Sequence, residues 1–520
     1  MTARDLLAQD FGLFAEVFAA QAAERGGHPA LIEGDRVVSY AELGQLTNRI
    51  AAALQRDGVG QGGVAAICAA AASIEYVAAF VGTLRAGAAA APLALSSTPQ
   101  ALAGMLADCG AGVVFLDRAA GAALSPFAGT LSARRVALDA SEAGAALDAW
   151  LPGPDAAPAD FEAGPLDAFN LIYSSGTTGA PKGIVQPHRM RWAQIGRGGY
   201  PAAAVTMIST PLYSNTTLVS LLPTLANGGT AVLRPRFDAG EFLRLAQRWR
   251  ATHAMLVPVQ YRRILEHPDF DACDLSSFEL KFCTSAPFPA ELKAEVLRRW
   301  PGGLVEFYGM TEGGGTFKLA AHERPDKLHT VGQPLPGHDI RLIDDDGRQL
   351  RAGEIGEVVG RSTTMMVGYH NRPDQTADAQ WISPEGDRFI RTGDVGRFDD
   401  EGFLTLLDRR KDLIISGGFN VYPSDLEAEL ARHPAVAECA VVGVDSRRWG
   451  ETPVGFAALR PGQAVTAEAL RAWTNARLGK TQRLSDLVII DVLPRNPIGK
   501  VLKRDLRDAY AGPALDGAAP

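Results

Sequence analysis

Apolar and polar residues recur along the chain with two different periods, and each period predicts its own kind of element. Within Tyr40–Asp57, Leu43, Leu46, Ile50 and Leu54 stand three or four positions apart, which is the spacing of one helix face. Elsewhere, short apolar runs have the length of buried strands. Helical and strand-like segments therefore alternate, as is typical of α/β layers. The runs predicted as strands in this part of the chain are Val64–Ala69, Ala89–Leu95, Val113–Leu116, Val205–Ser209, Thr230–Leu233, Ala254–Val259 and Leu304–Phe307.

The pattern changes near Asp339, where short strands stand between turn signals, and a compact αβ pattern resumes after Asp408. Asp148–Pro165 is rich in Pro, Ala, Asp and Gly, which predicts a surface loop. The small residues of Asp508–Pro520 predict a disordered tail. The strands predicted in this second part are Ile340–Ile343, Glu357–Gly360, Glu438–Val444, Val454–Leu459 and Leu487–Val492.

Composition places the chain among ordinary folded proteins. Hydrophobic residues make up 47% and charged residues 21%, which excludes a chain that is disordered throughout. With 51 Lys and Arg against 59 Asp and Glu, the net charge is −8, so we do not expect the protein to bind nucleic acid. A length of 520 residues allows about three domain-sized units.

The cysteines and the apolar stretches indicate a cytoplasmic protein. The five cysteines are scattered and have no CxxC spacing, so they predict buried thiols in a reducing compartment and no zinc site. The N-terminus lacks the basic and apolar regions of a signal peptide. The most apolar stretch, Val64–Leu95, is interrupted by Glu75 and Arg85, so we expect no membrane span.

The segment Leu171–Val185, LIYSSGTTGAPKGIV, joins an apolar strand to a loop rich in glycine and hydroxyl residues. Glycines let backbone N–H groups converge on phosphate oxygens, hydroxyls add donors, and a lysine adds charge. The spacing differs from that of a Walker loop. An ordinary surface loop is the alternative, but this density of donors favours a phosphate site. The predicted phosphate-binding residues are Ser174, Ser175, Gly176, Thr177, Thr178, Gly179 and Lys182.

This loop resembles the signature loop of the adenylate-forming superfamily, which comprises acyl-CoA synthetases, luciferases and the adenylation domains of peptide synthetases. Further motifs of that superfamily follow in its order, and the resemblance spans roughly residues 10 to 507. They are FYGMTE at Phe307–Glu312, RTGD at Arg391–Asp394, DRRKDLIISGGFNVYP at Asp408–Pro423 and NPIGK at Asn496–Lys500, with weaker matches at Ser39–Leu43 and Leu84–Leu93.

The resemblance implies an α/β fold in two domains. A large N-terminal domain, residues 1–408, is expected to hold two β-sheet/helix layers and a small barrel, and a small mobile αβ domain, residues 412–507, is expected to follow. Residues 409–411 are expected to form the hinge, with Lys411 as the hinge position. Each of the two orientations of the small domain would serve one half-reaction.

The chemistry that the resemblance implies is activation of a carboxylic acid by ATP. A carboxylate repels nucleophiles and lacks a leaving group, and a mixed anhydride with AMP removes both obstacles. Charge on the triphosphate must be neutralised, which calls for a metal, a cation and an N–H cradle. Glu312 is the candidate Mg²⁺ carboxylate, because magnesium takes one or two protein oxygens at nucleotide sites. By resemblance, Thr177 shares that ion.

The remaining site residues are assigned by the motifs. Lys500 is expected to bridge the attacking carboxylate and the α-phosphate, since a lysine is a mobile point charge. Asp394 can accept from both ribose hydroxyls, and Arg409 is expected beside it. The other residues implied at the nucleotide are Ser285, Ala286, Pro287, Glu306, Phe307, Tyr308, Gly309 and Thr311. The residues implied at the CoA tunnel are Ser416, Gly417, Gly418 and Phe419, for which a tight hairpin turn is the alternative.

The acyl pocket is where this sequence departs from the superfamily. Ser214 stands where relatives often place a histidine or aromatic residue, which removes the gate or replaces it with hydrogen bonding. Thr284 stands where many relatives have glycine and is expected to narrow the wall. Glu279 stands near the arginine of dicarboxylate-activating relatives, which argues against malonate-type acids. The predicted pocket residues are Tyr213, Ser214, Asn215, Thr284 and Gly309.

The leading prediction is an AMP-forming ligase that joins a fatty or aromatic monocarboxylic acid to CoA, using ATP and Mg²⁺. The alternative is an adenylation enzyme that loads a carrier protein, although PLYSNTT lacks the aspartate that amino-acid-activating members use. A luciferase-like oxygenase is less favoured. A non-catalytic nucleotide-binding protein is less favoured because Lys500, Glu312, Asp394 and Arg409 are all present. The acid, the acceptor, the pathway and the oligomeric state, a homodimer included, are left open.

Overall fold

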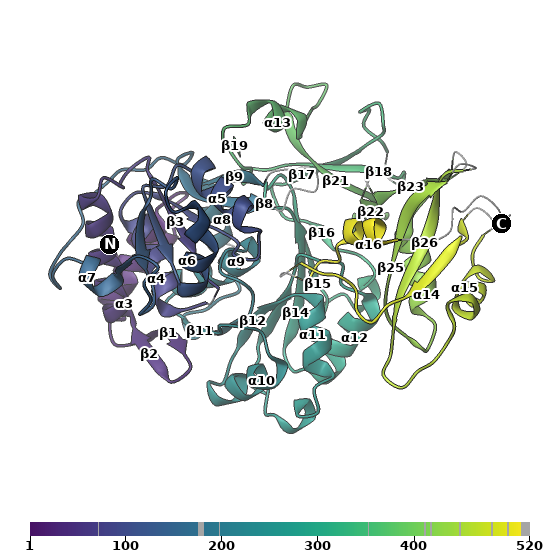
Figure 1. Cartoon of the computed structure of the whole chain (residues 1–520), viewed down its shortest axis with the longest axis horizontal. Helices are drawn as coiled ribbons and strands as arrows, with labels where there is room; N and C mark the ends of the chain where they lie inside the picture. Colours follow the sequence, from purple (N-terminus) through teal and green to yellow (C-terminus); the bar gives the residue numbers. More distant parts are fainter. Residues whose placement is uncertain are drawn as a thin grey trace. The chain divides into compact units, whose positions relative to one another are not determined.

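The computed structural model describes residues 1–70, 72–174, 181–196, 198–351, 353–409, 412–416, 419–446, 449–479, 482–496 and 499–510. The chain divides into two compact units, each a mixture of helices and sheets (Figure 1). Unit 1 consists of Met1–Asp339 and Gly360–Ile390, and unit 2 consists of Ile340–Val359 and Arg391–Pro520. The predicted boundary at residue 408 and the hinge at 409–411 stay predictions.

The first sheet of unit 1 has the strand order β16-β15-β14-β13-β12-β10-β11-β1-β2. Its strands from β14 to β1 are parallel, and its central strands are buried on both faces, as helix-covered parallel sheets require. The strands are β1 (Pro29–Glu33), β2 (Arg36–Ser39), β10 (Val205–Ile208), β11 (Thr230–Leu233), β12 (His253–Leu256), β13 (Leu280–Cys283), β14 (Gly303–Gly309), β15 (Thr316–Ala320) and β16 (Gln333–Pro334).

The second sheet of unit 1 has the order β19-β9-β8-β4-β3-β5-β6-β7. Strand β9 lies antiparallel to β8, and β19 lies antiparallel to β9, so this edge carries the two ends of the predicted phosphate loop. The strands are β3 (Val64–Cys68), β4 (Ala89–Pro92), β5 (Val113–Leu116), β6 (Arg134–Ala137), β7 (Ala145–Ala146), β8 (Ala168–Ser174), β9 (Lys182–Pro187) and β19 (Gly368–Tyr369).

The helix predicted from Tyr40 is confirmed as α3. It begins with a capping box, in which the Ser39 hydroxyl accepts from the Glu42 N–H while the Glu42 carboxylate accepts from the Ser39 N–H. The largest buried cluster joins this helix to α2, α4, α9 and strands of both sheets. The helices of unit 1 are α1 (Ala3–Leu7), α2 (Phe14–Glu24), α3 (Tyr40–Arg56), α4 (Ile74–Arg85), α5 (Pro99–Asp108), α6 (Arg118–Leu124), α7 (Leu147–Trp150), α8 (His188–Ile195), α9 (Asn215–Ala226), α10 (Ala239–Arg248), α11 (Pro258–Leu265), α12 (Ala290–Arg299) and α13 (Pro373–Asp378).

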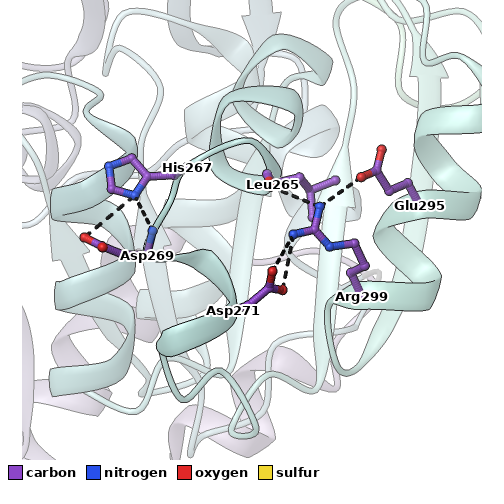
Figure 2. A network of polar contacts seen from close by, with 6 residues as sticks. All are labelled: Leu265, His267, Asp269, Asp271, Glu295 and Arg299. Carbon is purple, nitrogen blue, oxygen red and sulfur yellow. Dashed lines mark hydrogen bonds and ion pairs between the residues drawn. The ribbon is translucent and has the colours of Figure 1, made fainter.

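Arg299 on α12 connects neighbouring helical segments of unit 1 through hydrogen bonds and ion pairs (Figure 2). Its guanidinium donates to the Leu265 carbonyl at 3.0 Å, to Glu295 at 2.9 Å and to both oxygens of Asp271 at 3.1 and 3.2 Å. The same guanidinium lies over the Phe270 ring at 4.8 Å. One side chain thus joins the end of α11 to α12 and to the short 3₁₀ segment Phe270–Ala272.

Unit 2 contains a sheet of order β24-β23-β26-β25, with β27 beside β26. A second group of strands in this unit includes β22, which pairs antiparallel with the end of β21. The start of β21 belongs to unit 1 and pairs there with β20 (Gln380–Ile382). The elements are β17 (Asp339–Ile343), β18 (Gly356–Arg361), β21 (Arg388–Phe398), β22 (Leu404–Arg409), β23 (Ile414–Ser416), β24 (Phe419–Val421), α14 (Pro423–Ala431), β25 (Val436–Ser446), β26 (Gly450–Leu459), α15 (Ala467–Asn475), β27 (Asp486–Ile489) and α16 (Lys503–Ala509).

The mixed α/β fold class is confirmed, and several predicted element ends are corrected. The strands predicted over Ala89–Leu95 and Leu487–Val492 end at Pro92 and Ile489. The strand predicted over Ala254–Val259 ends early because Pro258 takes the first position of α11, where its missing N–H costs nothing. The loop predicted from Asp148 begins inside α7, and the tail predicted from Asp508 begins inside α16. In the described part of the chain, none of the helices has the length and apolar content needed to cross a membrane.

Candidate active site

The predicted phosphate loop connects two antiparallel strands of unit 1. Ser174, the last residue of β8, pairs with Lys182, the first residue of β9, so the two ends of the predicted phosphate loop lie side by side. The Lys182 ammonium lies 5.0 Å from the centre of the Tyr369 ring on β19. The other predicted members of the loop, Ser175, Gly176, Thr177, Thr178 and Gly179, lie outside the described residues.

The FYGMTE motif runs along β14 and into the turn that follows. Glycine is required after it, because Gly313 has φ +81° and an added Cβ would lie 2.1 Å from the Thr364 carbonyl oxygen. The Thr311 carbonyl accepts from the Gln186 side-chain amide at 2.7 Å. The Glu312 carbonyl accepts from the Met366 N–H at 2.8 Å. The Thr311–Glu312 turn is therefore held from two directions by backbone contacts.

Tyr369 brings the predicted cation and the predicted metal ligand together. Its hydroxyl donates to Glu312 Oε1 at 2.9 Å, while its ring lies beneath the Lys182 ammonium. Burial raises the pKa of Tyr369, and the Glu312 charge raises it further, so the phenol stays a donor at neutral pH. A basic and an acidic group thus flank one aromatic ring at the base of the phosphate loop.

The donor set around Glu312 fits magnesium in its usual nucleotide-bound form. Among the described residues, no group of three or more His, Cys, Asp or Glu side chains could hold a metal alone. A lone, partly exposed carboxylate suits Mg²⁺, which at such sites takes most of its ligands from phosphates and water.

Glu306, one position before FYGMTE on β14, is buried inside the fold. Its carboxylate forms an ion pair with Lys293 on α12, whose ammonium also donates to the Leu328 and Thr330 carbonyls at 2.8 and 3.0 Å. Burial raises the pKa of Glu306 to about 7, against the attraction of Lys293. The ion pair occupies the Glu306 side chain, and a contact of Glu306 with the nucleotide stays a prediction.

The aromatic residues of the motif pack against unit 1. Phe307 stacks on Phe282 with ring centroids 6.0 Å apart, and Tyr308 is tilted against Phe317 at 5.4 Å. At Gly309, an added Cβ would lie 3.1 Å from the Gly315 carbonyl oxygen. A side chain at position 309 would therefore require the neighbouring backbone to shift slightly.

Two segments predicted around the acyl group and nucleotide lie in contact. Ser285, which follows β13, has φ +80°, a strained conformation for a residue with a side chain. Its hydroxyl forms a hydrogen bond with the Thr216 hydroxyl on α9. This contact holds together the segment Thr284–Pro287, which includes Ala286, and the start of α9.

Ser214 is the N-cap residue of α9. Its hydroxyl accepts from the Thr216 N–H at 3.2 Å, and the residue is 7% exposed. The neighbouring Tyr213 hydroxyl lies 3.4 Å from the Ser96 hydroxyl, and Asn215 Oδ1 lies 3.5 Å from Gln186 Nε2. The predicted small polar position is therefore a buried helix cap, and a pocket lined by it stays a prediction.

In unit 2, the two residues predicted at the ribose are partners across a strand pair. Asp394 on β21 is in register with Arg409 on β22, and the Arg409 Nε lies 3.2 Å from Asp394 Oδ1. The Asp394 N–H donates to the Thr392 hydroxyl, which in turn donates to the Val358 carbonyl. The antiparallel register thus places a carboxylate and a guanidinium side by side, and their contact with a ribose stays a prediction.

Lys500 lies on a tight hairpin of unit 2. Its N–H donates to the Asn496 side-chain oxygen at 2.8 Å, and its carbonyl accepts from the Asn496 N–H at 2.9 Å. Arg495 and Val501 close the hairpin as a bridge, and Arg495 also donates to the Gly499 carbonyl. The backbone of Lys500 is thus firmly held.

The predicted CoA segment is a β-hairpin. Ser416 at the end of β23 pairs with Phe419 at the start of β24. The residues between them, Gly417 and Gly418, lie outside the described residues, as does Lys411.

Tyr369 and Gln186 were not predicted from the sequence. Gln186 and its cross-strand neighbour Asn170 gave a usable signal, since both are polar residues in apolar strands that flank the phosphate loop. Tyr369 gave no local signal, because it reaches Glu312 only through the pairing of β19 with β9.

Comparisons with known proteins identify the family of the chain. A family profile described as AMP-binding enzyme matches residues 18–370, and the profile of the C-terminal domain of AMP-binding enzymes matches residues 425–500. The chain is 33% identical to a feruloyl-CoA synthase of Amycolatopsis sp, over 92% of this chain and 96% of that protein. It is 31% identical to a fatty acid–[acyl-carrier-protein] ligase of Streptomyces coeruleorubidus, over 93% of this chain and 94% of that protein.

A solved structure shares the fold. The crystal structure of ATP-bound MatB from Rhodopseudomonas palustris has a TM-score of 0.85 and 28% identity, covering 95% of this chain and 99% of that one. The fold and the ordered motifs define an adenylate-forming enzyme. The chain belongs to the AMP-binding enzyme family. The superfamily resemblance is thereby confirmed, as is the predicted class, an AMP-forming acyl-CoA synthetase among the acid–thiol ligases.

Proposed function

We propose that this enzyme converts a monocarboxylic acid into its CoA thioester in two half-reactions. A carboxylate oxygen attacks the α-phosphorus of ATP and pyrophosphate leaves, which forms acyl-AMP. The CoA thiol then attacks the acyl carbon, its proton passes to solvent and AMP leaves. The observation that carries the proposal is the placement of Lys182 and Glu312 on either side of Tyr369, at the base of the predicted phosphate loop.

The residues of unit 1 supply binding and charge for the first step. The loop amides and Lys182 hold phosphate oxygens, and Thr311 contacts the α-phosphate. Glu312, with Thr177, would hold Mg²⁺, and a bound Mg²⁺ neutralises charge on the triphosphate. The hydrogen bond from Tyr369 supports this role, because it orients the Glu312 carboxylate without neutralising it.

The residues of unit 2 supply the ribose contacts and the mobile cation. Asp394 accepts from the ribose hydroxyls, and Arg409 orients that carboxylate from 3.2 Å. Lys500 is held by its backbone on the hairpin, so its ammonium can be presented to the carboxylate and the α-phosphate. Rotation of residues 412–507 about Lys411 exchanges Lys500 for the Ser416–Phe419 hairpin between the half-reactions.

A fatty or aromatic acid is the proposed substrate class. The feruloyl-CoA synthase relative supports an aromatic acid and the fatty acid ligase relative supports an aliphatic one. CoA is the proposed acceptor, and the carrier-protein relative supports the alternative, a protein-bound thiol. The Mg²⁺ requirement, a cytoplasmic location and a homodimer stay predictions.

The test is a pyrophosphate-release screen over fatty and aromatic acids, with CoA, with a carrier protein, or with neither acceptor. The expected result is release of pyrophosphate and AMP with at least one acid, and a thioester only when CoA is present. Release of ADP and phosphate would contradict the proposal. Acylation of the carrier protein but not of CoA would favour the alternative.

A further inference from the structure

Three polar side chains lie buried together beside the predicted phosphate loop. Asn170 on β8 and Gln186 on β9 face each other across the antiparallel pair, and Arg191 on α8 reaches both. Their exposed fractions are 0%, 0% and 1%. All three belong to unit 1, on the two strands that carry the loop and on the helix that follows them.

Arg191 is a buried cation whose partners are neutral. Its Nε donates to Asn170 Oδ1 at 2.9 Å, its Nη1 donates to Gln194 Oε1 at 2.8 Å, and its Nη2 donates to Gln186 Oε1. The guanidinium also lies 5.9 Å from the centre of the Phe169 ring. In the part of the chain that the structure describes, no carboxylate forms an ion pair with it.

An uncompensated buried charge of this kind is costly. Transfer of one ion from water into a protein interior costs several kcal/mol even after relaxation. Burial lowers the pKa of Arg191 to about 9, so the group still carries its charge at neutral pH. A positive charge that is retained at this cost is consistent with a role in attracting an anion. The substrates of the family, ATP and a carboxylate, are anions.

The guanidinium decides which way the Gln186 amide points. Because a guanidinium can only donate, the oxygens of both amides must face it. The Asn170 amide nitrogen then donates to the same Gln186 oxygen at 3.0 Å. The Gln186 nitrogen is left facing the other way, where it donates to the Thr311 carbonyl at 2.7 Å and lies 3.5 Å from Asn215 Oδ1.

We propose that Arg191 and Gln186 are positioning residues of the nucleotide site. Arg191 orients the Gln186 amide, and that amide holds the Thr311 carbonyl and with it the Thr311–Glu312 turn that receives the triphosphate. The positive charge of Arg191 adds to the attraction for the nucleotide. The inference rests on the proposed function, which places Thr311 and Glu312 at the α-phosphate and the metal.

A purely structural network makes a different prediction. If these side chains only hold β8, β9 and α8 together, any variant that disturbs them should lose stability and nucleotide affinity in parallel. If the side chains instead position the nucleotide site, a variant can lose nucleotide affinity without losing stability. The decisive variant is one that compensates the charge of Arg191 while it removes the hydrogen bond to the Thr311 carbonyl.

Gln186→Glu is that variant. One carboxylate oxygen keeps the bond to Arg191 and compensates its charge, and the other oxygen replaces the donor that faces the Thr311 carbonyl. We expect the melting temperature of the nucleotide-free enzyme to stay equal or rise. We expect the Kd for Mg·ATP, measured by calorimetry without any acid present, to rise about 10- to 100-fold, as loss of a buried hydrogen bond with repulsion in its place implies.

Gln194→Met is the matched control. It removes another acceptor of the same guanidinium but leaves the contact between Gln186 and Thr311 in place. Its Kd for Mg·ATP is expected to stay within about twofold of the parent. Arg191→Met is a second test, since it frees the Gln186 amide to turn and removes the charge; its Kd should also rise about tenfold or more without a matching loss of stability.

The outcomes separate cleanly. An unchanged Mg·ATP affinity in Gln186→Glu and Arg191→Met overturns the inference. A loss of affinity that is accompanied by a parallel fall in the melting temperature also overturns it, as does an equal loss of affinity in Gln194→Met. Failure of the proposed function shows elsewhere, as absence of pyrophosphate release by the parent enzyme with every acid. Weaker nucleotide binding at undiminished stability, in Gln186→Glu but not in Gln194→Met, supports the inference.

Discussion

Tyr369 can be dissected one interaction at a time, because its hydroxyl and its ring serve different partners. Tyr369→Phe keeps the ring beneath Lys182 and removes the hydroxyl that donates to Glu312 at 2.9 Å. A hydrogen bond to a charged group contributes about 1.5–3 kcal/mol, which corresponds to about 10- to 100-fold. We therefore expect the rate of acyl-AMP formation to fall by that factor at low Mg²⁺, with less loss at saturating Mg²⁺.

Tyr369→Leu removes the ring as well and should cost more. The Lys182 ammonium lies 5.0 Å from the ring centre, and a cation–π contact is worth about 0.5–2 kcal/mol. The further loss should be about 2- to 30-fold and should appear as a higher KM for ATP, because Lys182 is assigned to the phosphates. This second loss should not depend on the Mg²⁺ concentration.

The assay is ATP–pyrophosphate exchange over a range of Mg²⁺ concentrations. Tyr510→Phe is the matched control, because the Tyr510 hydroxyl also donates to a carboxylate, that of Asp486, at 2.7 Å, and no role at the site is proposed for it. Exchange in this control should match the parent. Exchange within about twofold of the parent for Tyr369→Phe at every Mg²⁺ concentration would refute the reasoning, because the hydroxyl would then contribute less than a typical hydrogen bond.

Lys500→Ala should slow acyl-AMP formation about 100- to 1,000-fold, because it removes a charge that stabilises the transition state. Thioester formation from supplied acyl-AMP should stay nearly unchanged. An equal loss of rate in both assays would contradict domain alternation. Ser214→Trp should weaken binding of the larger acids about 10- to 100-fold in a substrate panel, whereas Ser214→Ala, which removes only the helix cap, should keep the parent's preferences. Burial raises the pKa of Glu306 from 4.5 to about 7, so between these values the folded state holds a proton that the unfolded state has lost. The free energy of unfolding in urea should therefore fall as the pH rises through this window, and fall less in Glu306→Gln.

The corrected predictions share a physical cause. Apolar runs indicate where the chain is buried, but an element's end depends on backbone details that hydrophobicity does not carry. The run Ala254–Val259 is apolar throughout, yet the strand ends at Leu256 because Pro258 begins a helix. Ser214 shows a related limit for side chains, since a small polar residue suits both a pocket wall and a helix cap. Its hydroxyl caps α9, and its place in the acyl pocket stays a prediction.

The fold class, the family and the kind of chemistry could be predicted from the sequence alone. Those properties depend on local signals, such as several glycines and hydroxyl residues in one loop or a carboxylate at a fixed position in a motif. Such signals involve residues that are close in the sequence, so the sequence alone reveals them. Several of the motif residues also fall where strand register brings them together, as Asp394 and Arg409 do.

Which side chains support those motifs depends on how the strands pair in the folded protein. Tyr369 reaches Glu312 across 57 residues of sequence, and Gln186 reaches the Thr311 carbonyl across 125. Neither contact leaves a periodic trace, because each depends on which strands pair and in which register. The same pairing sets Asn170 opposite Gln186 and within reach of Arg191, and so creates a buried charge that the sequence showed only as an arginine on a short helix.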